Sequence, residues 1–149
     1  FIRSGFLLSD FDRAVTELHK RGIKVIVHLI LGLPGETKEM MRASVSYAAA
    51  LPVFGMKLQL LHILKGTDLL TYYERHPFYT FTLDDYCDFV TECVALLPPD
   101  IVIHRLTGDG PKKLLAAPLW SADKKRVLNQ LQRTFREKDI WQGKYYPQS

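Results

Sequence analysis

Apolar and polar residues along the chain recur with two different periods. Blocks with the three- and four-residue spacing of a one-sided helix predict helices at residues 9–21, 37–51, 67–75, 82–97 and 121–139, with a shorter helix at 111–116. Blocks that are short, apolar and rich in β-branched residues predict strands at residues 24–31, 56–63 and 101–104. Ser9, followed by Asp12, is typical of the start of the first helix.

The order of these elements predicts the fold class. Helices and strands alternate, which is typical of right-handed βαβ units and a parallel sheet in an α/β fold. The nearly continuous apolar run at 24–31 predicts a strand covered on both faces. Three strands cannot close a barrel, so the pattern favours half of one. We therefore expect βα units over residues 1–110 and a helical extension over residues 111–149.

Composition and charge narrow the function classes. The 149 residues are 47% hydrophobic, which suits one folded domain, and the formal net charge is +4. Segment 111–149 carries nine Lys and Arg against three Asp and Glu, a balance typical of binding to nucleic acid or another anion, or of a solvated helix face. No apolar run is long enough for a membrane helix and no signal peptide is evident, so we expect a cytoplasmic protein with no membrane partner. Because the chain opens on Phe1 and not Met, we expect it to begin inside a larger protein.

Candidate chemistry gathers where the predicted strands end. Loops 32–36, 62–66 and 105–110 each follow a strand, and ligands of parallel α/β folds lie at the carboxyl ends of strands. The first of these loops matches neither a P-loop nor a dinucleotide fingerprint, so it is equally well a structural turn. Cys87 and Cys93 are too few for a four-thiolate site, and no histidine has metal-ligand spacing, so we expect no metal site in this chain.

A set of motifs in fixed order resembles one enzyme family. The run Val-His-Leu-Ile-Leu-Gly-Leu-Pro-Gly-Glu-Thr, residues 27–37, resembles the fifth-strand motif of radical S-adenosylmethionine (SAM) enzymes, among them oxygen-independent coproporphyrinogen oxidase and the elongator-type tRNA-modifying enzymes. Residues 1–5 and 59–67 resemble the flanking segments of that motif. Residues 103–109, 117–120 and 141–144 resemble an uncharacterised bacterial family of Fe–S oxidoreductases in the elongator-like group.

The resemblance implies a partial (β/α)6 TIM-like barrel with parallel strands, of which this chain is the C-terminal half with extra C-terminal helices. It also implies a 4Fe–4S cluster on a Cys-x-x-x-Cys-x-x-Cys motif, with SAM bound to the cluster as the source of a 5′-deoxyadenosyl radical. That motif does not occur here. We therefore expect the cluster and SAM in the intact parent, neither of them bound to this chain alone, and a missing N-terminal half-barrel as partner.

Position in the fold and the resemblance each assign roles to individual residues. Because they lie at the end of the last strand, on the same rim as the other loops, His104, Arg105 and Asp109 are expected to meet the substrate, whose identity the sequence does not give. The residues matching SAM-binding positions are Arg3 for the carboxylate, His28 for the ribose hydroxyls, and Ile30, Gly32, Leu61 and His62 for the adenine. Taken without the resemblance, the place of His28 in the middle of a buried strand favours a core histidine over a ligand, and residues 107–110 are equally well a turn held by its own Asp.

Two further functions stay open from the sequence. The parent is alternatively an enzyme that modifies tRNA, with the basic residues of segment 111–149 contacting phosphates. The chain is alternatively a non-catalytic half-barrel module that dimerises through its exposed sheet edge.

Overall fold

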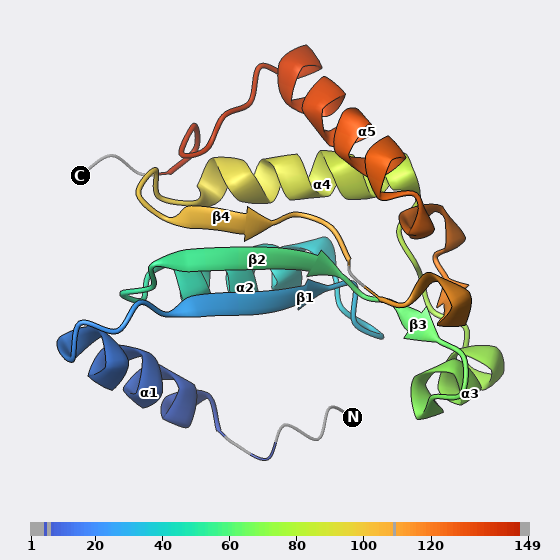
Figure 1. The fold of residues 1–149 in the computed structure, drawn as a ribbon, viewed down its shortest axis with the longest axis horizontal. Helices are drawn as coiled ribbons and strands as arrows, with labels where there is room; N and C mark the ends of the chain where they lie inside the picture. Colours follow the sequence, from blue (N-terminus) through green and yellow to red (C-terminus); the bar gives the residue numbers. More distant parts are fainter. Residues whose placement is uncertain (1–4, 6, 109, 147–149) are drawn as a thin grey trace.

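The computed structural model describes residues 5, 7–108 and 110–146, and Figure 1 shows their arrangement. The helices are α1 (Leu8–Lys20), α2 (Lys38–Ala49), α3 (Asp68–Arg75), α4 (Leu83–Leu96) and α5 (Lys124–Glu137). The strands are β1 (Ile26–Leu31), β2 (Gly55–Leu60), β3 (Ile63–Leu64), β4 (Val102–Arg105) and β5 (Leu115–Ala117), and short 3-10 turns span Lys112–Leu114 and Leu119–Ala122. None of the described helices is long and apolar enough to cross a membrane.

Side-chain caps fix where most helices begin. The caps of α2, α3, α4 and α5 each accept a hydrogen bond from a backbone N–H three residues later, which satisfies one of the free donors of the first turn. The capping residues are Thr37, Thr67, Thr82 and Asp123. The predicted helices at 37–51, 67–75, 82–97 and 121–139 are therefore confirmed to within a few residues.

The first helix begins differently from the prediction. It starts at Leu8, and the Asp10 carboxylate accepts a hydrogen bond from the Leu7 N–H at 3.0 Å. The predicted capping role of Ser9 with Asp12 is wrong, because Asp10 already occupies the position that reaches back to the start of the helix. Asp12 instead accepts from the Tyr47 hydroxyl of α2 at 2.6 Å, and this contact ties α1 to α2.

A parallel sheet forms the centre of the fold, as predicted. Its strand order is β1-β2-β4, with both pairs parallel. A second, antiparallel pair joins β3 to β5. The predicted helix at 111–116 is wrong, because residues 115–117 pair with β3 and leave only one 3-10 turn before them. Tertiary pairing here overrides the helical preference of a Leu- and Ala-rich segment.

Helices cover the central sheet on one face only. In Figure 1, α2 lies behind the three strands, and no described helix lies over the face turned toward the viewer. The side chains of Val27 and Leu31 are buried in a core shared with α2, α4 and α5, whereas Ile26, His28 and Ile30 on the other face of β1 are exposed. The prediction that this strand is covered on both faces is wrong for the described residues. We call the uncovered side the open face.

Core packing around β2 sets the stability of the sheet. Leu58 is 0% exposed at the centre of β2, so Leu58→Ala is expected to lower the free energy of unfolding by about 3 kcal/mol through lost burial and a cavity. The matched control, Leu128→Ala, removes a leucine that is 49% exposed on α5 and should cost less than about 0.5 kcal/mol. Urea unfolding followed by circular dichroism measures both, and equal losses would contradict this description of the core.

Candidate functional site

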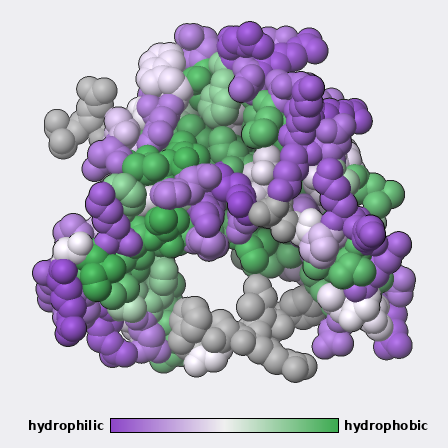
Figure 2. Space-filling view, viewed as in Figure 1, coloured by the Kyte–Doolittle hydropathy of each residue, from purple (hydrophilic) through white to green (hydrophobic). Residues whose placement is uncertain are grey.

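Three basic side chains lie in one row across the open face. The parallel register places His28 of β1 beside Lys57 of β2, and Lys57 beside Arg105 of β4. Paired residues of neighbouring strands point to the same side of a sheet, so the row crosses all three strands. Figure 2 shows hydrophilic surface in the middle of this view, with hydrophobic surface around it. We call His28, Lys57 and Arg105 the basic row.

A β-bulge brings Arg105 into the row. Met56 pairs with Ile103, but the next residue, Lys57, pairs with Arg105, so His104 is an extra residue in β4. In a regular ladder His104 would lie opposite Lys57, and Arg105 would point toward the helices. The bulge therefore turns the guanidinium toward the open face.

A glycine makes room for the bulged histidine. A Cβ placed on Gly55 would lie 2.7 Å from Cδ2 of His104, closer than real Cβ contacts allow. The His104 ring also meets the edge of Phe54, with the ring centroids 6.3 Å apart. Gly55 thus lets the His104 ring lie close to β2, next to the basic row.

The basic row alters its own electrostatics. The pKa of His28 is lowered by partial desolvation first, and then by the positive charges of Lys57, Arg105 and His104. Near neutral pH this favours the uncharged imidazole, which can both donate and accept a hydrogen bond. His28 is thus an exposed histidine on the open face and not the core histidine that its sequence context alone favoured.

A tight loop closes the carboxyl edge of β1. One carboxylate oxygen of Glu36, Oε2, accepts from the backbone N–H groups of both Gly32 and Leu33 at 3.1 Å. Gly32 has a φ of 90°, and a Cβ there would approach the Phe81 ring to 3.3 Å. A side chain at this position would therefore be strained as well as crowded. These contacts fix the loop beside Ile30.

His62 binds a different part of the chain. The Gly110 N–H donates to its Nδ1 at 3.2 Å, which leaves the ring proton on Nε2, 3.0 Å from Ser121 Oγ. The Ser121 hydroxyl donates in turn to the Pro118 carbonyl at 2.8 Å. A Cβ on Gly108 would collide with Nε2, so only glycine leaves room for this ring. His62 thus joins the end of β2 to the loop after β4 and to the C-terminal segment.

The structure brings some of the predicted site residues together and separates others. Ile30 lies on the open face with the basic row and His104, and Gly32 lies at its carboxyl edge. Leu61 is half-buried and continues the ladder by donating to the Leu31 carbonyl at 2.9 Å, and His62 contacts residues outside the open face. Arg3 and Asp109 lie outside the described residues. The roles assigned to all these residues stay predictions.

The comparisons with known proteins decide the family. Residues 53–137, more than half of the chain, match the family described as the Radical_SAM C-terminal domain. The chain belongs to this family. The matched residues include β2 and β4 of the parallel sheet and the helices α4 and α5, which pack in one core.

The curated relatives are longer than this chain. The chain is 39% identical over 140 residues to the uncharacterised protein YtqA of Bacillus subtilis and 30% identical over 139 residues to YhcC of Escherichia coli. It spans 92% and 93% of its own length in these matches but only 44% and 45% of the relatives' length. In structure it is similar to Elp3 of Methanocaldococcus infernus, with a TM-score of 0.75 at 18% identity, covering 94% of this chain and 33% of that one. That likeness shows the fold.

Sequence reasoning missed two residues of the open face, Lys57 and Gln59. Both belong to β2 and are half-buried, and they alternate with the buried residues Met56, Leu58 and Leu60. The alternation was readable in the sequence and would have placed Lys57 and Gln59 together on one face.

The cysteines of this radical-SAM domain lie away from the open face. Cys87 and Cys93 are fully buried in α4, and burial raises the pKa of each thiol to about 12. Neither thiol is therefore ionised near neutral pH. Among the described residues, no three His, Cys, Asp or Glu side chains come close enough together to hold a metal ion.

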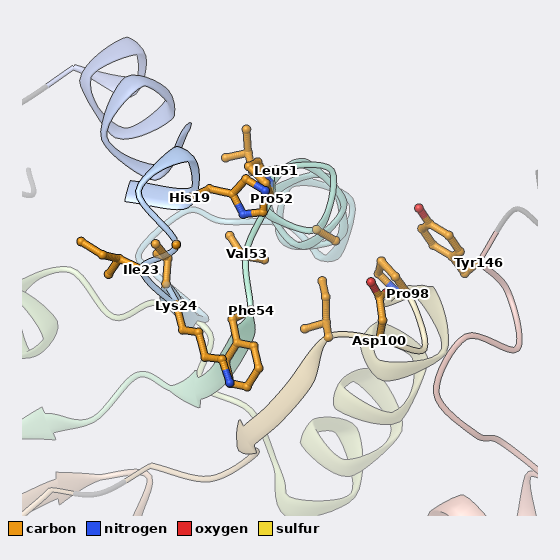
Figure 3. A pocket seen from close by; sticks show the side chains of 14 residues that line it. His19, Ile23, Lys24, Leu51, Pro52, Val53, Phe54, Pro98, Asp100 and Tyr146 are labelled. Carbon is orange, nitrogen blue, oxygen red and sulfur yellow. The ribbon is translucent and has the colours of Figure 1, made fainter. Parts of the chain in front are cut away.

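A pocket at the opposite edge of the sheet is not the candidate site. It has a volume of about 470 Å³ and lies at the amino ends of the strands, between the end of α1, the loops before β2 and β4, and Tyr146. Figure 3 shows Lys24 beside the Phe54 ring, and the ammonium lies 4.3 Å from the ring centroid. Ligands of parallel α/β folds bind at the carboxyl edge, where the loop after β1 lies.

The His62 contacts predict a measurable loss of stability. Ser121 is buried, so Ser121→Ala should lower the free energy of unfolding by about 1–2 kcal/mol by leaving the His62 Nε2–H without this acceptor. The control Ser46→Ala removes an exposed hydroxyl from α2 and should change stability by less than about 0.5 kcal/mol. Urea unfolding compares the two variants, and the same small change in both would show that the His62–Ser121 contact contributes nothing.

Proposed function

We propose that this chain is the C-terminal half of a radical-SAM oxidoreductase. In the intact protein, a 4Fe–4S cluster and SAM generate a 5′-deoxyadenosyl radical that acts on a substrate still to be identified. The open face forms one wall of the barrel that holds SAM. The observation that carries this proposal is the exposed face of a parallel sheet, bordered by the Glu36-bound loop, in a member of the radical-SAM C-terminal domain family.

The residues of this chain fit SAM but not the cluster. Both cysteines are buried in α4, so the cluster ligands come from the rest of the intact protein. Ile30 is 49% exposed beside Gly32, and together they offer a flat apolar surface for an adenine. His28 lies two residues before Ile30 on the same face of β1, and its ring nitrogens can donate to and accept from ribose hydroxyls.

The free edge of β1 supports the join to the rest of the barrel. The carbonyls of Val25 and Leu31 accept from the β2 side, so the N–H and C=O groups of the alternate residues point toward the other edge. No described strand pairs with that edge. The relatives YtqA and YhcC are more than twice as long as the matched region, which leaves ample chain for a preceding half-barrel.

Two isoleucines on the same face of β1 test the SAM-binding wall. In the anaerobically reconstituted intact protein, Ile30→Ser should raise the Kd for SAM about tenfold, because a lost apolar contact of this size is worth about 1.4 kcal/mol. Ile26→Ser is the control, since Ile26 is 37% exposed at the amino end of the same strand. Equilibrium dialysis with labelled SAM measures both constants.

Two outcomes would contradict the proposal. One is an intact protein that binds no SAM when its cluster is present, and the other is an equal effect of the two Ile→Ser variants. The rival half-barrel module predicts instead that the chain forms a stable dimer through the β1 edge. Sedimentation of the chain, first alone and then mixed with the N-terminal half of the intact protein, shows whether its partner is a second copy of the chain or that N-terminal half.

Action on tRNA is a second candidate, supported by the surface of α5. The helix carries five Lys and Arg residues against one Glu, and all of these side chains are exposed: Lys124, Lys125, Arg126, Arg133, Arg136 and Glu137. A relative that is 27% identical over 121 residues, a Dehalococcoides mccartyi protein, is named a tRNA uridine(34) acetyltransferase, and the match covers 26% of its length. Contacts of α5 with phosphates would make the affinity fall steeply with salt.

Charge reversal on α5 tests the tRNA candidate. In the intact protein, the double variant Lys125→Glu, Arg126→Glu should lower the affinity for bulk tRNA at least about tenfold at low salt and flatten its salt dependence. The control double variant Lys20→Glu, Arg21→Glu makes the same change in net charge at the end of α1, where both side chains are exposed. Filter binding over a salt series measures the affinities. A similar loss in both double variants would mean that the protein binds tRNA only through its overall charge.

A further inference from the structure

The basic row lowers the stability of the folded chain. Lys57 and Arg105 are paired across β2 and β4, and like charges directly opposite each other in a sheet are destabilising. His28 lies on the other side of Lys57. None of the residues in β1, β2 and β4 is acidic, and no ion pair joins Lys57 to another described residue. Stability alone does not account for this arrangement.

Two local features of the backbone bring the basic side chains together and do not reduce their electrostatic repulsion. The bulge at His104 turns Arg105 to the open face, where a regular strand would have pointed it at the helices. The missing side chain at Gly55 lets the His104 ring lie beside the row. Arg105 has a further interaction of its own, so the proposal rests first on Lys57, a half-buried residue in the middle of the row.

The depth of the row separates it from the carboxyl edge of the sheet. His28 and Lys57 precede Ile30 and Gln59 by one alternation, a distance of about 7 Å along the strands. A ligand group that reaches the row must therefore extend past the surface assigned to adenine, toward the amino ends of the strands. A small terminal group of a substrate fits this geometry.

We propose that Lys57 and Arg105 of the basic row bind an anionic group of the substrate, a carboxylate or a phosphate. Lys57 supplies the central charge and Arg105 two further parallel donors, and His28 keeps its proposed role toward the ribose hydroxyls of SAM. This deepens the proposed function and depends on it, since the substrate is the one that meets the radical in the intact barrel. The site differs from the position of the SAM carboxylate, which the family resemblance assigns to Arg3.

Titration of His28 tests the row in this chain without SAM or a cluster. Sulfate serves as the probe, because it keeps two negative charges throughout the titration of a histidine. The imidazole signal of His28 is assigned by its loss in His28→Gln and followed by NMR against pH. A bound anion should raise the pKa of His28, since it offsets the positive charges of Lys57, Arg105 and His104.

The matched variants are Lys57→Met and Lys125→Met. Lys57→Met should raise the pKa of His28 in the absence of sulfate, because it removes a positive neighbour, and should abolish the further rise that millimolar sulfate produces. Lys125→Met, on the exposed side of α5, should leave both values as in the parent chain. Sodium chloride at the same ionic strength controls for screening. The proposal would be overturned if sodium chloride raised the pKa of His28 as much as sulfate does, or if sulfate still raised this pKa in Lys57→Met.

Measurements on the intact protein distinguish substrate from SAM as the source of the anion. With the cluster in place, Lys57→Met should change the Kd for SAM by less than about threefold, and sulfate should not compete with SAM. A tenfold weaker SAM complex in Lys57→Met would assign the row to the SAM carboxylate and overturn the proposal. A His28 pKa above its ordinary value in the intact protein without added anion would overturn it as well, because acidic residues of the other half would then already neutralise the row.

These outcomes are separable from a failure of the proposed function. If sulfate does not bind the row but the intact protein still cleaves SAM, the radical-SAM proposal stands and only the anionic substrate is lost. If sulfate binds the row but no SAM binds the intact protein, an anion site stands, but the radical-SAM proposal falls and with it the assignment of the anion to a substrate of the radical.

Discussion

The central sheet buries alternate side chains against helices on one face only, and the other features of the molecule depend on that constraint. Along β2, Met56, Leu58 and Leu60 enter the core, which forces Gly55, Lys57 and Gln59 to the opposite side. A parallel sheet in a completed α/β domain is covered on both sides. An open face and an unpaired edge on the same sheet are therefore complementary features, and one further half-barrel would cover both.

Backbone contacts at the carboxyl edge prepare this face for a ligand. Glu36 holds two consecutive N–H groups of the loop after β1, and His62 holds the loop after β4 through Gly110. Both are polar side chains that bind backbone, so they fix the loops without requiring a ligand. Rigid loops around a sheet lower the entropy that a ligand must lose on binding. During a reaction, the substrate would then move while the open face and its loops stay in place.

The sequence was sufficient for the five longer helices and the three strands of the central sheet, and insufficient for features that depend on contacts made across the fold. Caps such as Thr37 and Thr82 act on the next turn, so local pattern located their helices correctly. The strand at 115–117 exists because β3 lies beside it, and a local reading favoured a helix there. The bulge at His104 depends on the register with β2, so no strand pattern alone could show that His104 and Arg105 share a face. The open side of β1 was missed for a related reason, since an apolar run does not say how many faces are covered.

Amide hydrogen exchange along β1 is the most direct test of the central claim that this sheet continues into a barrel. The N–H groups of Ile26, His28 and Ile30 point to the free edge, away from β2. Their exchange is compared between the chain alone, at a concentration where it is monomeric, and the intact protein. A neighbouring strand in the intact protein should slow these three amides at least about 100-fold. Equal rates in the two samples would contradict the account, because the edge would then be free in the whole protein as well.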